Sequence, residues 1–261
     1  MSDVRKPLMA GNWKMNLNHF EAVAHVQKMA FALDDADYDA CEVVVLVPFT
    51  DLRSLQVLVD ADKLRIQYGS QDISAHEKGA YTGEVAGSML SKIGCSYAVV
   101  GHSERRQYHG ETNEDINAKA LAALANGITP IICYGEALEV REAGDQVMYS
   151  LDQVEKCLAG FTPEQAASVV LAYEPIWAIG TGLTASPTDA QEVCGATRGW
   201  LTDHFGSEVA NSIRILYGGS MKGSNVASLM SQPDIDGGLV GGASLDPDEF
   251  VAMARHRLLT P

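Results

Sequence analysis

The sequence lacks long hydrophobic runs and is poor in positive charge. No stretch approaches the roughly 20 consecutive apolar residues of a membrane-spanning helix, and Arg5 and Lys6 precede only a short apolar run. The chain carries 19 Lys and Arg against 34 Asp and Glu, a formal net charge of −15 at pH 7. Such a charge disfavours nucleic acid and anionic bilayers as partners. We therefore expect a soluble, unprocessed protein in which an anionic ligand needs a local positive site.

Metal-binding cysteine pairs and nucleotide-binding motifs are also absent. The five cysteines show no CxxC spacing and no histidine-rich neighbourhood, which argues against zinc and against a disulfide framework. They are Cys41, Cys95, Cys133, Cys157 and Cys194. Their odd number and wide scatter are typical of a reducing cytoplasm. The chain has neither GxGxxG nor GxxxxGK followed by Ser or Thr, so a dinucleotide-dependent redox enzyme and a kinase both lose their main support.

What the chain does have is an alternation of short apolar runs and longer amphipathic segments, with no linker between them. With 261 residues and 46% apolar content, we expect residues 1–261 to form one domain. The expected strands are Leu8 to Trp13, Glu42 to Val47, Arg65 to Gln71, Tyr97 to Gly101, Thr129 to Tyr134, Ser168 to Tyr173, Arg214 to Tyr217 and Gly238 to Val240. Eight strand-then-helix units predict a single-domain α/β fold, the (β/α)8 TIM barrel with parallel strands, and an open doubly wound sheet is the alternative.

Three helix starts can be placed from local chemistry. Ser186 can cap a helix that has Pro187 in its first position, and Asp246 repeats that pattern near the C-terminus. Thr112 and Asp115 have the spacing of a capping box. The first of these helices has an apolar face formed by Ala190, Val193, Cys194, Thr197 and Leu201.

Barrel active sites lie at the C-terminal ends of the strands, and those ends are unusually polar in this sequence. The polar ends are Gly11 to Asn16, Gly101 to Arg106, Glu174, Tyr217 to Ser220 and Val240 to Ala243. Together they supply a cation, an imidazole, a carboxylate and glycine-bearing loops. Proton abstraction next to a carbonyl needs a base, an electrophile for the developing oxyanion and exclusion of water, and all three are available here.

Three titratable side chains at these ends are candidates for catalysis. Glu174 follows a buried strand and precedes Pro175, which forbids helix there, so we interpret Glu174 as a base beside a movable lid. His102 precedes a helix-compatible segment whose N-terminus disfavours a positive charge on the imidazole and so favours a neutral ring that can donate a hydrogen bond. Lys14 is the local cation that an anionic ligand needs. Taken singly, each has a plainer interpretation as a surface carboxylate, an ordinary histidine or a solvated lysine.

Two glycine pairs follow the seventh and eighth expected strands. Gly218–Gly219 and Gly241–Gly242 would be plain tight turns in most sequences. Glycine also lets backbone N–H groups approach an anion closely, and a phosphate site after strands seven and eight recurs in TIM barrels. Two such pairs at those two strands favour a phosphate site.

Together these segments resemble the triosephosphate isomerase family over nearly the whole chain. The matching runs, in the family's order, are Gly11 to Asn16, Gly101 to Arg106, Tyr173 to Gly182, Tyr217 to Ser220 and Leu239 to Gly242. The run Tyr173 to Gly182 resembles the family's lid. The resemblance implies interconversion of D-glyceraldehyde 3-phosphate and dihydroxyacetone phosphate through an enediolate, in glycolysis, gluconeogenesis and the pentose shunt. It implies no metal and no organic cofactor.

The same resemblance assigns roles to individual residues. It makes Glu174 the base that moves protons between two carbons and His102 the neutral electrophile. Lys14 stabilises charge on the enediolate and the phosphate, and Asn12 orients the substrate oxygens. Glu104 is a supporting carboxylate near Lys14, although a charge at a helix start is its plainer interpretation. The backbone groups assigned to the phosphate belong to Gly180, Ser220, Gly241 and Gly242.

The resemblance extends to the family's long third loop, here Gln71 to Ser74 and Gly79 to Glu84. In the family this loop packs into a partner subunit, which implies a homodimer with Tyr81, Thr82 and Glu84 at the interface. The loop is long for a barrel connection and mixes apolar with polar residues, so a monomer would have to hold it extended in water. We expect a two-fold dimer with Thr82 near the active site of the other subunit.

Two other functions remain open at this point. The first is another phosphosugar enzyme on the same barrel, such as an epimerase, or an aldolase that uses Lys14 as a Schiff base. The second is a binding or scaffold protein that kept the barrel and lost catalysis, which the fold alone permits. A matched base and electrophile beside a lid argue against the scaffold.

Overall fold

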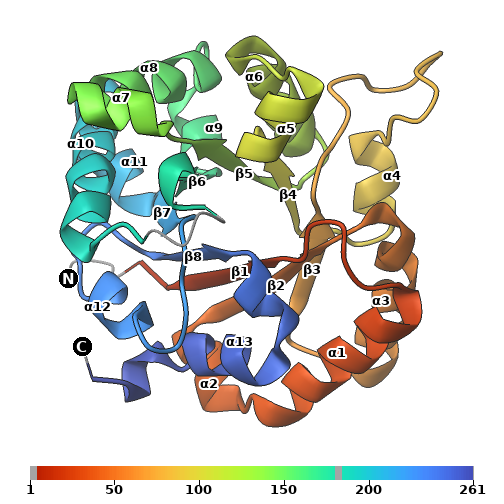
Figure 1. The fold of residues 1–261 in the computed structure, drawn as a ribbon. Coiled ribbons are helices and arrows are strands. Elements are labelled where there is room, and N and C mark those ends of the chain that lie inside the picture. The colour runs from red at the N-terminus through yellow and green to blue at the C-terminus, as the bar shows by residue number, and fades with distance from the viewer. Residues whose placement is uncertain (1–4, 180–183, 261) are drawn as a thin grey trace.

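The structure is a computed structural model that describes residues 5–179 and 184–260 (Figure 1). Its strands form a closed barrel in which each strand is hydrogen-bonded to the next and the last closes on the first. They are β1 (Leu8–Asn12), β2 (Glu42–Val47), β3 (Gln67–Ser70), β4 (Tyr97–Val100), β5 (Thr129–Tyr134), β6 (Val170–Tyr173), β7 (Arg214–Tyr217) and β8 (Gly237–Val240). All neighbouring pairs are parallel. The predicted (β/α)8 barrel is confirmed, and the open sheet is excluded.

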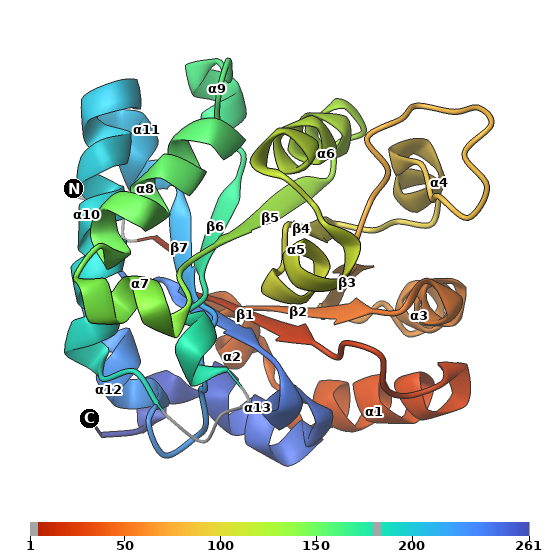
Figure 2. The ribbon, with the colours of Figure 1, turned by 45° about the horizontal axis from the view of Figure 1, so that its top comes forward.

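Helices surround this barrel on the outside, as Figures 1 and 2 show. They are α1 (His19–Ala32), α2 (Asp35–Ala40), α3 (Phe49–Asp62), α4 (Gly87–Lys92), α5 (Ser103–His109), α6 (Asn113–Ala125), α7 (Leu138–Ala143), α8 (Gln146–Cys157), α9 (Pro163–Ala166), α10 (Pro187–Phe205), α11 (Ser207–Ser212), α12 (Val226–Met230) and α13 (Pro247–Ala254). Three short 3-10 turns are η1 (Ile176–Ala178), η2 (Gly242–Leu245) and η3 (His256–Leu258). Within the described ranges, none of the helices has the length and apolar content needed to cross a membrane.

The predicted helix starts are confirmed. The Ser186 side chain caps α10 and accepts a hydrogen bond from the backbone N–H of Asp189 at 3.1 Å. Thr112 caps α6 in the same way, and Asp246 caps α13. The apolar face expected on the first of these helices is buried, as the positions of Ala190, Val193, Cys194, Thr197 and Leu201 show.

Some strand boundaries differ from the prediction by one or two residues. The sixth strand was expected from Ser168, but β6 begins at Val170. The backbone N–H groups of Ser168 and Val169 donate to carbonyls of α9 and continue its last turn. Ser168 and Val169 are compatible with a strand, but they lie before Val170, the first residue of β6 that pairs with β5.

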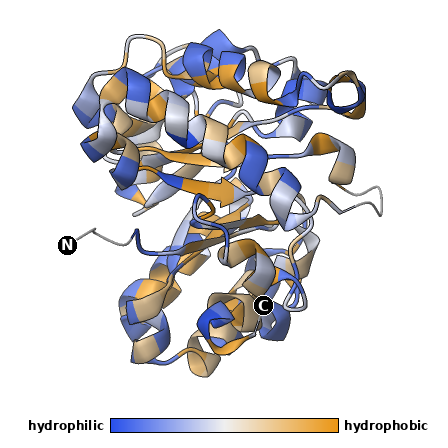
Figure 3. Ribbon diagram, turned by 90° about the vertical axis from the view of Figure 1, so that its left-hand side faces the viewer, coloured by the Kyte–Doolittle hydropathy of each residue, from blue (hydrophilic) through white to orange (hydrophobic). Residues whose placement is uncertain are grey.

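Two apolar layers hold the barrel together, because successive strand residues point to opposite faces. On β1, Leu8 and Ala10 point into the barrel, where they join an inner cluster with residues such as Val99 and Ile131. Met9 instead joins the larger cluster between the barrel and the helices. Figure 3 agrees: the central strands are coloured apolar, whereas the helices carry both kinds of residue. The rigid barrel leaves its strand ends free to carry a site.

Candidate active site

A cavity of about 300 Å³ opens at the C-terminal ends of the strands. It is lined by Asn12, Lys14, His102, Ala178, Ile179, Gly218, Gly219, Ser220, Met221, Lys222, Leu239, Gly241, Gly242 and Ala243. Most of the residues predicted from the strand ends thus line one cavity, although Glu174 and Glu104 are not among its lining residues. Lys222 is a second cation at the cavity that the sequence analysis missed, because it lies beyond the run that ends at Ser220.

Glu174 lies directly after β6, and its side chain is buried. Its backbone N–H donates to the carbonyl of Tyr134 at 2.7 Å, so the β5–β6 ladder places the residue. Its carboxylate accepts hydrogen bonds from the backbone N–H of Ser103 at 2.8 Å and from the Ser103 hydroxyl at 3.1 Å. A Cβ at Gly218 would come within 2.9 Å of the Glu174 Cγ, so that glycine makes room for the carboxylate's chain.

His102 caps α5 and faces Glu174. Its Nδ1 atom accepts a hydrogen bond from the backbone N–H of Glu104 at 3.2 Å. An Nδ1 that accepts carries no proton, so in this arrangement the proton of the ring is on Nε2. That Nε2 atom lies 3.1 Å from Oε1 of Glu174. The helix start thus sets the tautomer and aims one N–H donor at the carboxylate.

Ser103 is the contact that the sequence analysis did not foresee. It is the first residue of α5, where backbone N–H groups have no partner within the helix. The one available signal was its place directly after His102 at a predicted helix start, because such a position binds a carboxylate readily.

Lys14 sits in a left-handed backbone conformation, with φ of 54°. That conformation is uncommon for a residue with a side chain. It is held by the Oδ1 atom of Asn12, which accepts from the Lys14 backbone N–H at 3.1 Å, and by the Gln71 amide, which donates to the Lys14 carbonyl at 2.9 Å. The Lys14 Nζ atom lies 2.5 Å from Oε1 of Glu104. Asn12 and Glu104 are thus direct partners of Lys14, one for its backbone and one for its charge.

The loops after β7 and β8 also line the cavity. The carbonyl of Ser220 accepts a hydrogen bond from the Asn225 side chain at 3.0 Å, which fixes that loop on the start of α12. A Cβ at Gly242 would meet nothing within 4 Å, so its backbone borders open space. One at Gly241 would lie 3.5 Å from the Lys14 Cε, so the lysine side chain runs past this loop. Of the four predicted phosphate residues, Gly180 lies outside the described residues.

Comparison with known proteins adds to this geometry. The family model described as triosephosphate isomerase matches residues 7–257. The chain is 65% identical to the triosephosphate isomerase of Streptomyces coelicolor over 253 residues, which cover 97% of this chain and 98% of the relative. It is 60% identical to the triosephosphate isomerase of Corynebacterium efficiens over 252 residues, which cover 97% and 96%. The chain belongs to the triosephosphate isomerase family. It is therefore an enzyme of the aldose–ketose isomerase class.

In this member of the triosephosphate isomerase family, the first residues of the segment predicted as the lid contact the buried carboxylate of Glu136. Oε1 of Glu136 accepts hydrogen bonds from the Tyr173 hydroxyl at 3.0 Å and from Trp177 Nε1 at 2.9 Å. Burial raises the pKa of Glu136 above its ordinary value, against the opposing effect of these two donors. The sequence analysis missed Glu136 even though it follows the end of β5. Residues 180–182 of the predicted lid lie outside the described residues.

The third loop, which the triosephosphate isomerase resemblance assigns to a dimer interface, projects from the barrel between β3 and α4 (Figures 1 and 2). Ile73 at its base is buried, whereas Thr82 and Glu84 are exposed. Tyr81 is 45% exposed and stacks on His76, with ring centroids 3.6 Å apart. The loop therefore keeps its shape by internal contacts while presenting its tip to the outside.

No group of three or more His, Cys, Asp or Glu side chains among residues 5–179 and 184–260 is arranged to hold a metal ion.

Proposed function

We propose that this chain interconverts D-glyceraldehyde 3-phosphate and dihydroxyacetone phosphate through an enediolate, with residues 1–261 acting as one catalytic domain. The observation that carries the proposal is the approach of Glu174 Oε1 to His102 Nε2, 3.1 Å apart beside the cavity. A carboxylate and an imidazole N–H are the base and the electrophile that proton transfer between adjacent carbons requires.

Glu174 is the proposed base. It takes a proton from one substrate carbon, which leaves the enediolate, and returns the proton to the neighbouring carbon, so that no atom is gained or lost. To reach the substrate, the carboxylate has to leave the two hydrogen bonds from Ser103. The burial of Glu174 supports this role, because a base shielded from water does not lose its proton to solvent.

The other predicted side chains act on the oxygens. The Nε2–H of His102 donates to the substrate carbonyl and stabilises negative charge as it develops there. Lys14 supplies the positive charge, and Asn12 orients the substrate and holds the Lys14 backbone. Glu104 keeps the Lys14 ammonium in place through their contact of 2.5 Å. A substrate anion that reaches Lys14 therefore meets a cation that is already positioned.

The phosphate group is proposed to bind backbone N–H groups of Ser220, Gly241 and Gly242, together with Gly180 of the lid. The open space beside Gly242 supports this assignment, because a phosphate oxygen can approach its N–H without a steric clash. A phosphate grip far from the reacting carbons also lets binding energy hold the lid shut during the chemical step.

An assay of triose-phosphate isomerisation tests the proposal directly. The purified chain is expected to convert dihydroxyacetone phosphate to D-glyceraldehyde 3-phosphate without any added cofactor, at a rate far above that of an E174Q variant. The aldolase alternative predicts instead that borohydride traps a substrate adduct on Lys14. An adduct on Lys14, or equal rates in both proteins, would overturn the proposal. If neither the wild-type chain nor E174Q exceeded the uncatalysed rate, the scaffold protein would be the better interpretation.

We further propose a homodimer in which the third loop, with Tyr81, Thr82 and Glu84, packs against a second copy near Asn12 and Lys14. The support is the exposed apolar and polar tip on a loop that projects away from its own barrel. Deleting residues 79–82 is expected to give folded monomers with much reduced activity. Sedimentation and the isomerase assay decide it: a fully active monomer, or a wild-type chain that is monomeric at micromolar concentration, contradicts the proposal.

Glycolysis is the setting that the enzyme's family gives, and we extend it to gluconeogenesis and the pentose shunt. A cytoplasmic location is also proposed. All five cysteines are free and buried, a state that a reducing compartment preserves. If the protein were purified under oxidising conditions and still contained five free thiols, that argument would be weaker.

A further inference from the structure

His25 is a buried histidine on α1 that contacts two loops of the active site. Its Nε2 atom lies 3.0 Å from the carbonyl oxygen of Ser244 in η2. Its ring packs edge-on against Trp13, with centroids 5.0 Å apart and planes at 79°. One side chain therefore touches both the segment that follows β8 and the segment that follows β1.

The direction of the hydrogen bond follows from its partner. A carbonyl oxygen only accepts, so Nε2 of His25 carries the proton and donates it to Ser244. Burial lowers the pKa of His25, with a further lowering by Lys28, while the Ser244 carbonyl and Asp246 act in the opposite direction. The ring is therefore a neutral donor at neutral pH.

Ser244 passes this contact on to the loop assigned to phosphate. Its backbone N–H and its hydroxyl both donate to the carbonyl of Gly241, at 2.8 and 2.7 Å. Ser244 is also seated directly on β1, because a Cβ at Gly11 would come within 3.0 Å of the Ser244 Cβ. His25 thus holds Ser244, a residue that also packs against β1 and binds the carbonyl of Gly241.

The carbonyl of Gly241 and the N–H of Gly242 belong to one peptide unit. That unit is planar and trans, since the described chain has no cis peptide bonds, so its C=O and N–H point in opposite directions. When Ser244 fixes the carbonyl, it also fixes the direction of the Gly242 N–H, which points away from Ser244. Gly242 lines the cavity, and its N–H is one of the proposed phosphate donors.

The second contact of His25 acts on the loop after β1. Trp13 is fully buried and precedes Lys14, and its backbone N–H donates to the carbonyl of Leu46 at 3.1 Å. Packing of Trp13 against His25 therefore adds a side-chain support just before the left-handed residue that carries the proposed cation.

We propose that His25 is a positioning residue for phosphate binding: it holds the Gly241–Gly242 peptide through Ser244 and supports the Lys14 loop through Trp13. This inference rests on the proposed function, because it takes the Gly241–Gly242 peptide as part of the phosphate site and Lys14 as the cation beside it. It predicts weaker binding of phosphate-bearing ligands when the donor is removed, with the chemistry at the substrate carbons largely preserved.

The test compares H25L, which removes the donor at similar volume, with H25Q, whose amide can donate in its place. H256L is the matched control, because His256 is another histidine whose pKa burial lowers, in η3. Binding of inorganic phosphate, KM and kcat for dihydroxyacetone phosphate, and kcat/KM for phosphate-free D-glyceraldehyde are measured for each. For H25L we expect KM and the phosphate Kd to rise roughly three- to tenfold, the loss of one hydrogen bond. H25Q is expected to recover most of this, and H256L to match wild type.

The outcomes separate this inference from the function beneath it. A wild-type protein that does not bind inorganic phosphate at the cavity refutes the phosphate site and His25's role together. A wild type that binds phosphate and an H25L variant that binds it equally well refute only the role of His25, as does an equal fall for D-glyceraldehyde. If H25L does not fold, S244A removes one of the two bonds to Gly241, and an unchanged KM in that variant refutes the proposal.

Discussion

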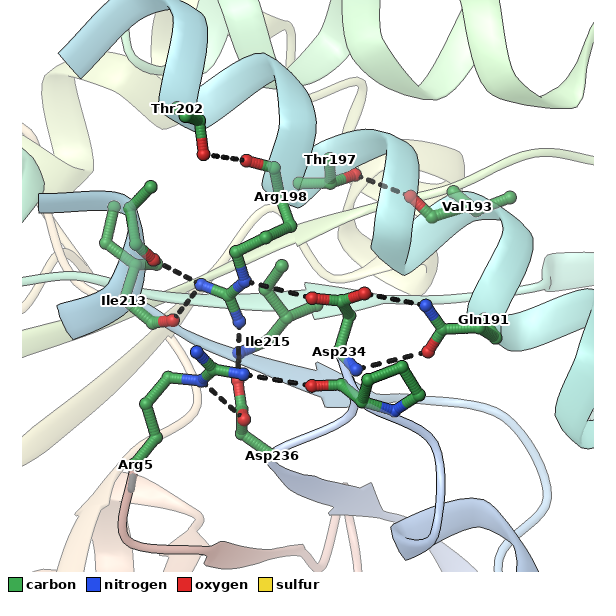
Figure 4. Close-up of polar contacts among 12 residues, drawn as sticks. Arg5, Gln191, Val193, Thr197, Arg198, Thr202, Ile213, Ile215, Asp234 and Asp236 are labelled. Atoms are coloured by element: carbon green, nitrogen blue, oxygen red, sulfur yellow. Dashed lines mark hydrogen bonds and ion pairs between the residues drawn. The ribbon is translucent and has the colours of Figure 1, made fainter. Parts of the chain in front are cut away.

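The two ends of the barrel treat their charged groups in opposite ways. At the N-terminal end, Arg198 is buried and uses its guanidinium on two carboxylates and two carbonyls (Figure 4). It contacts Asp236 at 2.7 Å and Asp234 at 3.4 Å, and it donates to the carbonyls of Ala210 and Ile213. Each of the three guanidinium nitrogens therefore has a partner within the protein. The cluster serves the structure of this end.

Asp236 is matched just as completely at the same end. Besides Arg198 it accepts from Arg5 at 2.7 Å and from the backbone N–H of Ile215 at 2.9 Å (Figure 4). At this same end, Glu42, the first residue of β2, forms an ion pair with Arg214 at 2.6 Å and accepts a hydrogen bond from the Tyr97 hydroxyl at 2.6 Å. These groups link strands that are distant in sequence, which makes the end a structural cluster.

At the C-terminal end the polar groups lie at or beside a cavity. The Lys14 ammonium pairs with one carboxylate, and its backbone is kept in a left-handed conformation. Glu174 is held by bonds that it can exchange for a substrate. The comparison teaches that polar density alone does not mark an active site in this barrel. The distinguishing property is a position at the strand ends that borders open space.

The sharpest way to break this comparison is to neutralise the proposed base. E174Q is expected to lower kcat by about 10²- to 10⁴-fold, the range of a positioned general base. The thermal midpoint should change little, because the amide oxygen can still accept from the backbone N–H of Ser103, and the Ser103 hydroxyl can turn to accept from the amide NH2. E164Q is the control, since Glu164 is an exposed carboxylate on α9. Near wild-type turnover in E174Q would remove Glu174 from the mechanism.

The opposite change tests the N-terminal end. R198M is expected to lower the free energy of unfolding by about 3 kcal/mol, because it leaves the buried carboxylate of Asp236 without one of its two arginine partners. Folded R198M should retain its kcat. R65M is the control, because the pairs of Arg65 with Asp35 and Asp39 are exposed and should each contribute little. Loss of kcat without loss of stability in R198M would mean that the two ends are not separate in function.

The sequence predicts much of the C-terminal end and little of how its residues touch. Strand ends converge in any closed parallel barrel, so Lys14, His102 and Glu174 could be placed together from strand order alone. The Ser103 contact with Glu174, the Gln71 contact with Lys14 and the Glu136 contact with the lid depend on lateral distances between neighbouring loops, which no periodicity encodes. The Arg198 cluster was missed for the same reason, since its partners come from three separate segments of the chain.

A smaller effect is expected from the cation of the C-terminal end. K14M should weaken inhibitors that carry phosphate roughly 10- to 100-fold, the scale of a hydrogen bond to a charged group. The protein should remain folded, because the Lys14 ammonium is partly exposed and its ion pair with Glu104 is not buried. Inhibition constants measured against K156M, which removes an exposed ammonium of α8, provide the comparison. Unchanged affinity and rate would return Lys14 to the class of solvated lysines.

The smallest expected effect concerns pH, and here two carboxylates at opposite ends should respond with opposite sign. Burial alone would raise the pKa of Glu42, but the Tyr97 hydroxyl and Arg214 hold it below its ordinary value near 4.5. Its contribution to stability is therefore present above that pH and is lost as pH falls through the folded pKa. Glu136, in contrast, has a pKa raised by burial. Its contribution is present below its ordinary value near 4.5 and is lost as pH rises through the folded pKa.

Urea unfolding of wild type, E42Q and E136Q between about pH 4 and pH 8 measures how the contribution of each carboxylate to the free energy of unfolding changes with pH. The stability difference between wild type and E42Q should shrink as the solution is made more acidic, because protonation removes the charge that Arg214 and Tyr97 bind. The difference between wild type and E136Q should grow in the same direction, because protonation relieves a buried charge that two hydrogen-bond donors only partly compensate. Parallel slopes for the two variants would show that both carboxylates are equally well paired. The distinction between a fully matched N-terminal end and an incompletely matched C-terminal end would then fail for these two groups.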